Sequence, residues 1–454
     1  MTTIPPSTAA GRIAPRSDWE AEAVSRPGGA EVLPHVVAWN LTRRCNLECG
    51  HCYIAAGAWH GAAGELSTAD CLRVVDQILD LSPAAMLILS GGEPLLREDL
   101  ETIAHRAADG GATVVVGTNG TRLTTARIRS LKAAGVRGVA VSIDSLDPAY
   151  HDRFRHGAGS LAETQAAIDR LGEEELDFVV QTTVTRGNLD EIPRLAAWSA
   201  EKGAVSFNCY FIVPTGRAAG MRALAPEEND EVLTKLVRLG REYRGRMMVR
   251  SKCQPQIMRH AHVRDPESGL LDYATRCPCG VQYCRITPDG KVTPCPYMPV
   301  EAGDLASASF AEIWRRSEVF RELRTGRLGG RCGRCEYRVV CGGCRARALA
   351  ELDDMLAEDP ACAYEPTGGS PLVEPRGVTY GSPAERALPW SAAAEERMRR
   401  VPGFVRAVVT ARVESYAAER GYALVTEDVI DEVRSALPID FAKRKPFFLG
   451  RDGS

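Results

Sequence analysis

Three cysteines near the start of the chain are spaced so that their thiolates could meet at one centre. Cys45, Cys49 and Cys52 form a C-x3-C-x2-C motif within the segment WNLTRRCNLECGHCY. Thiolates are the ligands that iron–sulfur clusters require, usually four to a cluster. Three local cysteines would therefore leave one iron open to a substrate or cofactor. A zinc site or unrelated buried thiols are the alternatives, but zinc sites more often use paired C-x2-C motifs.

The motif resembles the signature of the radical S-adenosylmethionine (SAM) enzymes. In that family the three cysteines hold a [4Fe–4S] cluster, and the amino and carboxylate groups of SAM chelate its fourth iron. The reduced cluster cleaves SAM to a 5′-deoxyadenosyl radical. Tyr53, the aromatic residue after the last cysteine, also fits the family pattern. The resemblance implies that the hard chemistry belongs to the cofactor, while the protein supplies placement and exclusion of water.

Composition places the chain among ordinary globular proteins. It has 454 residues, with 44% hydrophobic residues, 25% charged residues and a net charge of −3, which suggests two or three domains. This charge predicts no broad nucleic-acid surface, and no apolar run is long enough to span a bilayer. The N-terminus shows no export signal, so we expect a cytoplasmic location. Fifteen cysteines without an export signal indicate metal ligation rather than disulfides.

The elements that must position these residues alternate between short apolar runs and helical patterns. We predict strands at residues 36–41, 86–89, 113–116, 138–143, 178–183 and 205–213. We predict helices from Ser67, where Asp70 completes a capping signal, and over residues 98–109, 125–134, 161–171 and 189–202. This alternation indicates an α/β fold of parallel units, either a doubly wound sheet or a barrel. The family resemblance implies the partial (β/α)6 barrel, with functional groups at the C-terminal ends of its strands.

Candidate SAM-binding residues follow the predicted strands. Gly91, Gly92 and Glu93 begin a GGEP sequence after the second strand. The glycines allow close backbone approach to a ligand, and Glu93 could accept hydrogen bonds from an ammonium group. The sequence resembles the family's GGEP motif, which contacts the amino group of SAM. Taken alone, GGEP would be interpreted as a turn.

Four further candidates follow the third, fourth and sixth strands. Asn119 ends the third strand. Ser142 and Asp144 are two residues apart at the end of the fourth strand, so we expect them to face the same side. The matching positions in similar enzymes bind the ribose of SAM, and a turn that closes the strand is the alternative. Val213 opens a segment, VPTGR, that resembles the stretch near the adenine in close relatives.

A second field of cysteines runs from Cys277 to Cys362. Its densest part reads C-x2-C-x5-C-x2-C and could alone be a zinc site. Beside the first motif, the field resembles the SPASM extension, which carries one or two auxiliary [4Fe–4S] clusters. The last C-x2-C is one residue shorter than the commonest SPASM spacing. By the family's order of ligands, one cluster would be held by Cys332, Cys335, Cys341 and Cys362, and the other by Cys279 (or Cys277), Cys284, Cys295 and Cys344.

We predict that the remaining cysteines are not cluster ligands. Cys71 and Cys209 fall in predicted barrel elements and are expected to be buried small hydrophobic residues. Cys253 lies in a charged region together with His260 and His262. Isolated histidines among arginines and aspartates are more often solvated than ligating, and substrate contact is the alternative.

The chain divides into seven predicted segments. They are a mobile arm (1–33), the barrel (34–217), a mostly helical bridging region (218–275), the cluster domain (276–366), a linker (367–385), a small helical domain (386–446) and a tail (447–454). In the cluster domain, residues 310–324 predict one amphipathic helix whose aromatic residues pack on the barrel. Residues 401–437 resemble the C-terminal domain of light-independent protochlorophyllide reductase, and a generic helical docking domain is the alternative.

Residues 35–366 resemble the tetrapyrrole-modifying branch of the radical SAM enzymes. That resemblance implies hydrogen abstraction from a haem precursor and removal or remodelling of its propionate side chains. It also implies SAM, a SAM-binding cluster, auxiliary clusters and a reducing electron donor such as ferredoxin or flavodoxin. An auxiliary cluster would accept the surplus electron or position the substrate. No catalytic acid or base can be named, because substrate-facing positions vary across the family.

Two other functions are weighed against this one. A SPASM maturase would modify a ribosomally made peptide, but such enzymes often carry a winged-helix module before the barrel, and the arm here is too short for one. A non-catalytic iron–sulfur electron carrier would have no need of a SAM pocket.

Overall fold

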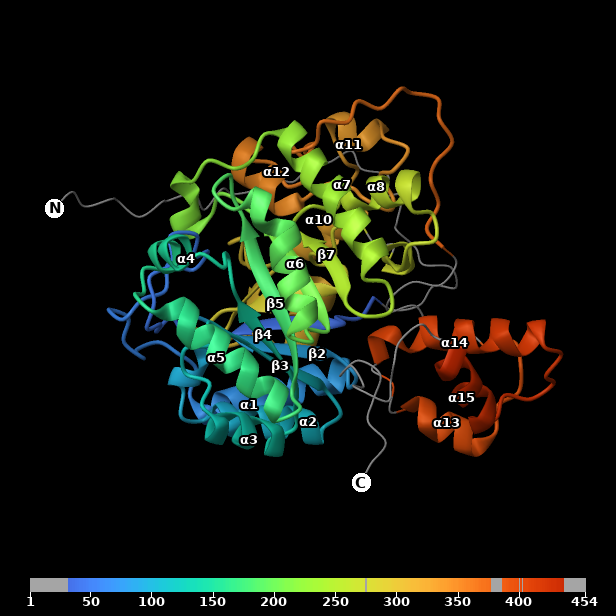
Figure 1. Ribbon diagram of the computed structural model, residues 1–454, viewed down its shortest axis with the longest axis horizontal. Coiled ribbons are helices and arrows are strands. Elements are labelled where there is room, and N and C mark those ends of the chain that lie inside the picture. Colours follow the sequence, from blue (N-terminus) through green and yellow to red (C-terminus); the bar gives the residue numbers. More distant parts are fainter. Residues whose placement is uncertain (1–31, 274–275, 377–385, 400, 402, 437–454) are drawn as a thin grey trace.

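The computed structural model describes residues 32–273, 276–376, 386–399, 401 and 403–436 (Figure 1). The predicted tail and most of the predicted arm lie outside these residues, as does part of the predicted linker. Two residues at the end of the arm are described: Val32 and Leu33 pack against the main core. Trp314 Nε1 donates a hydrogen bond to the Val32 carbonyl at 2.7 Å.

The described strands form one sheet in the order β10-β9-β8-β1-β2-β3-β4-β5-β6-β7. Its central strands are rich in β-branched residues, as in TVVVGT, because parallel strands are covered on both faces. Neighbours from β8 to β7 are parallel. The bounds are β1 Val36–Asn40, β2 Met86–Ser90, β3 Thr113–Thr118, β4 Val136–Ser142, β5 Asp177–Val184, β6 Ser206–Phe211, β7 Met248–Lys252, β8 Tyr283–Ile286, β9 Lys291–Thr293 and β10 Gly303–Asp304. The predicted α/β class and partial barrel are confirmed.

Helices follow the strands and lie outside them (Figure 1). Helix α1 shows why: Ser67 Oγ caps it by accepting from Asp70 N at 3.2 Å, and apolar residues line its inner face. The barrel helices are α1 Thr68–Leu81, α2 Leu100–Asp109, α3 Thr125–Ala133, α4 Pro148–Arg155, α5 Ser160–Glu173 and α6 Ile192–Glu201. Short 3₁₀ helices are η1 Pro94–Leu96, η2 Leu189–Glu191, η3 Gly216–Gly220 and η4 Gly269–Tyr273.

The bridging region contains helices and also a strand that was not predicted from the sequence. Helices α7 Pro226–Glu242 and α8 Ile257–Arg264 flank strand β7, which pairs with β6 and extends the barrel. Its sequence, MVRSK, carries two cations and does not resemble a buried strand. Helix α4 was missed too, although Asp147 and Pro148 form a start signal for it, with an aspartate cap before a proline.

The cysteine-rich segment joins the same sheet. Strand β8 pairs with β1, so this segment is continuous with the barrel. Its helices are α9 Phe310–Arg316, α10 Glu318–Thr325, α11 Gly330–Arg334 and α12 Arg345–Leu352. The single helix predicted over residues 310–324 is two helices, because Ser317 leaves the helical conformation (φ −58°, ψ 127°). Trp314 and Phe320 are fully buried, as expected.

Three helices near the C-terminus, α13 Ala392–Arg399, α14 Gly403–Glu419 and α15 Glu427–Ala436, surround a small core of their own. Figure 1 shows them beside the barrel. No helix within the described parts of the chain is long and apolar enough to cross a membrane.

Candidate active site

The first cysteine motif lies on the loop between β1 and α1, at the C-terminal edge of the sheet. Cys45, Cys49 and Cys52 line a cavity of about 620 Å³. Backbone amides of Leu47 and Ala56 donate to the sulfurs of Cys45 and Cys52, both at 3.4 Å. Such donors stabilise thiolates that ligate a metal, so this loop is suited to hold a cluster.

Burial changes the acidity of these thiols. It raises the pKa of Cys45 to about 12, and it also raises the pKa of Cys49. Without a metal both side chains are therefore neutral at pH 7. Iron binding must displace their protons, so cluster assembly releases protons.

The Arg155 guanidinium supports the second cysteine. Its Nη1 lies 3.8 Å from Cys49 Sγ, and its Nε donates to the Asp144 carboxylate at 2.6 Å. Both side chains are buried. Asp144 also accepts from Thr183 N at 2.8 Å, so both of its oxygens have donors. Arg155 lies on α4, one of the elements that the sequence analysis missed.

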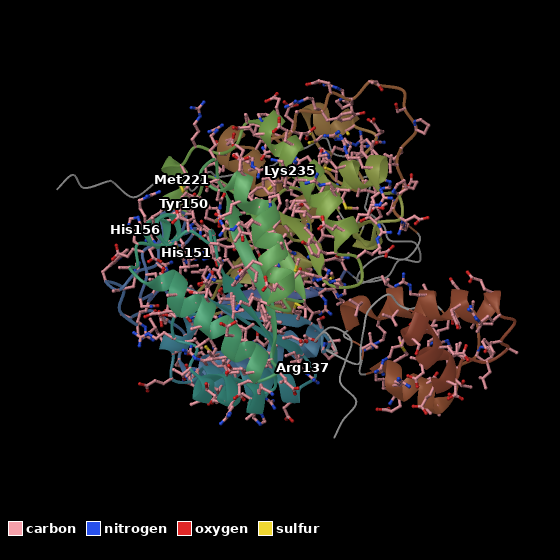
Figure 2. The ribbon with its side chains drawn as sticks, in the orientation of Figure 1. Arg137, Tyr150, His151, His156, Met221 and Lys235 are labelled. Carbon is pink, nitrogen blue, oxygen red and sulfur yellow. The ribbon has the colours of Figure 1, made fainter. Side chains whose placement is uncertain are left out.

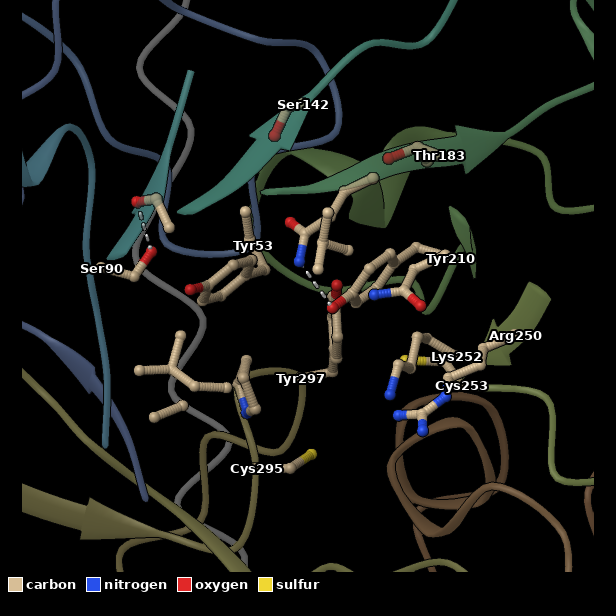
Figure 3. Close-up of a pocket in the computed structure, with 18 of the residues that line it drawn as sticks. Tyr53, Ser90, Ser142, Thr183, Tyr210, Arg250, Lys252, Cys253, Cys295 and Tyr297 are labelled. Carbon is tan, nitrogen blue, oxygen red and sulfur yellow. Dashed lines mark hydrogen bonds between the residues drawn. The ribbon is translucent and has the colours of Figure 1, made fainter. Parts of the chain in front are cut away.

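This arrangement corrects the expectation that Ser142 and Asp144 face the same side. Ser142 lines the cavity, as Figure 3 shows, whereas Asp144 is not among the lining residues. The alternation of a strand does not reach Asp144, because β4 ends at Ser142. Asp144 instead orients Arg155 against the cysteine loop.

Gly91 and Gly92 line the cavity and press against the cysteine loop. A Cβ at Gly91, where φ is +148°, would lie 2.5 Å from the Thr42 carbonyl oxygen. A Cβ at Gly92 would lie 2.3 Å from the Arg44 carbonyl oxygen. These positions require glycine because the turn after β2 packs on the backbone that carries Cys45.

Glu93 is buried behind the cavity wall and is not among the lining residues. It accepts from Thr118 Oγ1 at 2.8 Å, from Asn119 N at 2.9 Å and from Leu95 N at 3.0 Å. Burial raises the pKa of this carboxyl group. The Asn119 side chain lines the cavity and donates to Asn46 Oδ1 at 2.9 Å. Glu93 therefore ties the end of β2 to the end of β3 and so positions Asn119.

The segment after β6 also clamps the cysteine loop. Arg217 Nε donates to the Cys49 carbonyl and Nη1 to the Ala56 carbonyl, each at 2.8 Å. Val213 is fully buried among the later cysteines and is not a lining residue. Tyr53 lines the cavity, and its hydroxyl accepts from Asn40 Nδ2 at 2.8 Å.

The second cysteine field forms two groups. An outer group surrounds a small separate cavity of about 30 Å³ and contains all four cysteines predicted for one auxiliary cluster, namely Cys332, Cys335, Cys341 and Cys362. An inner group lines the large cavity and contains Cys253, Cys277, Cys279, Cys295 and Cys344. Figure 3 shows Cys253 and Cys295 beside the same space.

The inner group differs from the predicted ligand set at one position. Cys284 is absent from the lining residues and belongs to the main barrel core. Tyr283, its neighbour on β8, lines the cavity, so alternation turns Cys284 to the other face. Cys253, to which the sequence analysis gave no ligand role, directly follows β7 and joins the group.

A buried ion pair connects the two groups. Arg347 Nη1 lies 3.1 Å from both oxygens of Asp359, and both side chains are fully buried. Asp359 accepts from Cys344 N at 2.7 Å, and its own amide donates to Cys332 Sγ at 3.4 Å. Arg347 Nη2 donates to the Cys253 carbonyl at 2.8 Å. One Arg–Asp pair thus fixes cysteines of both groups.

The large cavity is positively charged and partly aromatic. Arg250 and Lys252 line it from β7, and its described lining residues include no aspartate or glutamate. Burial lowers the pKa of Lys252 to about 8. Tyr53, Tyr210 and Tyr297 surround the same space (Figure 3). Figure 2 draws the side chains of the described residues and labels Lys235 on helix α7.

Arg250 and Lys252 were not predicted as site residues from the sequence, and neither was their strand. One signal could have found them: Met248, Arg250 and Lys252 alternate with Val249 and Ser251, so the two cations share one face. Cations on one face of the last strand of a barrel indicate that a polar ligand binds beside that strand.

Comparison with known families agrees with this geometry. Residues 39–198 match the radical SAM superfamily, and residues 277–344 match SPASM, the iron-sulfur cluster-binding domain. Residues 390–434 match the proto-chlorophyllide reductase 57 kD subunit family.

Individual proteins show the same relationship. The chain is 38% identical to the AdoMet-dependent heme synthase of Methanosarcina barkeri, over 73% of this chain and 97% of that protein. It is 31% identical to the pre-heme d1 synthase of Dinoroseobacter shibae, over 72% of this chain and 85% of that protein. The fold is similar to that of SuiB from Streptococcus suis, solved with S-adenosylmethionine bound, at a TM-score of 0.61 and 14% identity, covering 73% of this chain and 78% of that one.

Proposed function

We propose that this chain, which belongs to the radical SAM superfamily, removes or remodels the propionate side chains of a tetrapyrrole. The observation that carries the proposal is the large cavity, which joins the cysteine loop to the inner cysteine group and bears Arg250 and Lys252 without any carboxylate among its described lining residues. A substrate that is largely apolar and carries carboxylates complements such a wall. The similarity to two haem-forming enzymes supports the same substrate class.

The cofactors of the family are SAM and iron–sulfur clusters, and the residues present fit them. Cys45, Cys49 and Cys52 would hold the SAM-binding cluster, with Gly91, Gly92, Asn119, Ser142 and Tyr53 on the surrounding wall. Bound there and supplied with one electron by the external reductant, SAM would provide the chemistry of hydrogen-atom abstraction. Glu93 and Asp144 act one layer further out, where they position Asn119 and Arg155.

The chain's own residues bind and orient the substrate. A propionate side chain that loses one hydrogen atom, one electron and carbon dioxide becomes a vinyl group. Arg250 and Lys252 would hold the carboxylate before it leaves, and the tyrosines would contact the flat ring. We further propose that the inner cysteine group holds the acceptor of the electron and that ferredoxin or flavodoxin is the external donor.

The test is anaerobic reconstitution with iron and sulfide, followed by incubation with SAM, a reductant and iron-coproporphyrin, and mass spectrometry of both products. We expect deoxyadenosine together with loss of carbon dioxide from the porphyrin, and an unchanged porphyrin when its propionates are methyl esters. We expect Lys252→Met to raise the porphyrin KM about tenfold, as for the loss of one charge-assisted hydrogen bond. Lys235→Met on α7, outside the cavity lining, is the matched control.

Two outcomes would contradict the proposal at different levels. Deoxyadenosine with an unchanged porphyrin would reject the tetrapyrrole and direct the search to peptides. Intact clusters without any deoxyadenosine would reject the role of Cys45, Cys49 and Cys52.

A further inference from the structure

We propose that Cys253 is a ligand of the cluster held by the inner cysteine group and that Cys284 is not. Cys253 lies outside the segment that matches the SPASM domain, residues 277–344. The inference concerns the cluster site alone and does not depend on the identity of the substrate.

The inner group offers five thiols, whereas a cluster usually takes four. Cys277 and Cys279 are two residues apart, and their sulfurs lie 3.4 Å from each other. Two thiols this close reach the site from the same side, so together they can ligate a cluster from one direction only.

The other three thiols come from separate elements. Cys295 follows β9, Cys344 precedes α12, and Cys253 follows β7. Four directions thus converge on the inner site only when Cys253 is counted. Cys253 also packs against the cluster of buried residues that contains Cys295 and Cys344.

The backbone at Cys253 is held in a conformation that a cysteine rarely adopts. Its φ of +60° lies in the left-handed region, which is strained for a residue other than glycine. The hydrogen bond from Arg347 to the Cys253 carbonyl, at 2.8 Å, fixes this conformation. Through Asp359 the same arginine is coupled to the amide of Cys344. One buried pair therefore orients two thiols toward the same site.

Cys284 lacks each of these features. It lies in the middle of β8, opposite Val37 of β1, and both side chains are fully buried in the main core. To reach the inner group, β8 would have to shift by one residue, which would move every side chain of the strand to the other face.

The experiment reconstitutes the full chain and its alanine variants anaerobically and measures iron and acid-labile sulfide per chain, with electron paramagnetic resonance of the reduced protein. We expect Cys253→Ala and Cys295→Ala to lose the same signal and up to about four iron atoms each. We expect Cys284→Ala to keep the iron content of the unaltered chain, as should Cys71→Ala, a buried thiol outside both groups.

Full iron content with an unchanged spectrum in Cys253→Ala would overturn the inference, as would loss of the signal in Cys284→Ala. Full iron content in Cys295→Ala would show that the inner group holds no cluster and would overturn it as well. If Cys253→Ala does not fold, Cys253→Ser decides: an oxygen ligand should alter the spectrum of this cluster, and an unaltered spectrum would reject the proposal. None of these readouts requires a porphyrin, so they separate this inference from the proposed function.

Discussion

At the scale of single residues, the site depends on a buried ion pair of which only the arginine lines the cavity. Asp144 and Arg155 form an ion pair at 2.6 Å behind the cysteine loop, and the arginine reaches the sulfur of Cys49. Breaking a buried pair leaves one charge without a partner, which is more costly than replacing both residues by apolar ones. The role of the pair is therefore to hold Cys49 in place.

His151, next to this pair, should make the protein sensitive to acid. Its Nδ1 accepts from Asp144 N at 3.2 Å, and burial, followed by the charge of Arg155, lowers its pKa from 6.5 to about 4. As the pH falls below 6.5, His151 becomes protonated in the unfolded chain, whereas in the folded protein it stays neutral until about pH 4. The free energy of unfolding should thus decrease by about 3 kcal/mol across this window.

Urea unfolding at a series of pH values from 7 to 4 measures this effect. In His151→Asn the amide oxygen can keep the acceptor position of Nδ1 but does not titrate, so the pH slope should become shallower. Equal slopes in both proteins would contradict the assignment to His151.

At the scale of elements, the turn after β2 and the loop after β1 form one unit. Gly92 N donates to the Thr42 carbonyl at 2.8 Å, and Glu93 N to the Arg44 carbonyl at 2.9 Å. The GGEP sequence therefore shapes the cysteine loop, and its contact with SAM remains a proposal. The loop after β6 adds to this support through Arg217.

Gly92→Ala should disturb the cysteine loop directly. The new Cβ would lie 2.3 Å from the carbonyl oxygen of Arg44, and backbone atoms cannot move aside as a flexible side chain can. We expect the reconstituted variant to lose about four iron atoms, one cluster, while the outer group keeps its own. Iron analysis and circular dichroism check this expectation.

The control is Gly240→Ala on α7, where an added Cβ meets no atom within 4 Å. Alanine favours a helix over glycine, so this variant should keep its iron and fold at least as stably. A Gly92→Ala protein with the same iron content as this control would contradict the steric argument.

At the scale of the whole molecule, the barrel and the cysteine-rich segment share one sheet and one cavity. Strand β8 pairs with β1, and the inner cysteines line the same space as Cys45, Cys49 and Cys52. The pair of Arg347 and Asp359 then links the inner group to the outer group. The cluster sites are thus coupled to the barrel through hydrogen bonds as well as through the sheet.

The three C-terminal helices form a separate packing unit. Buried residues such as Ala394, Val413 and Val429 make a core distinct from that of the barrel. Removal of residues 386–454 should therefore leave iron content and the rate of deoxyadenosine formation within about twofold, because no barrel residue belongs to that core. Anaerobic reconstitution of the shortened chain tests this, and loss of its clusters would show that the helices stabilise the barrel.

The sequence by itself determined the features that depend on local spacing. The strands and helices of the barrel follow from hydrophobic periods, and Cys45, Cys49 and Cys52 lie close enough in sequence to meet on one loop. Strand β7 and helix α4 were exceptions. In β7 the pattern is hidden because a strand at the rim of a ligand cavity carries cations.

Only the tertiary structure decided which distant side chains meet. Whether Cys284 or Cys253 faces the inner site depends on the face that each strand turns to the cavity and on where that strand ends. Asp144 lies outside the cavity and pairs with Arg155 because β4 ends at Ser142, before the alternation of the strand reaches it. Spacing along the chain cannot fix these choices, since a shift of one residue in the pairing of two strands exchanges their faces.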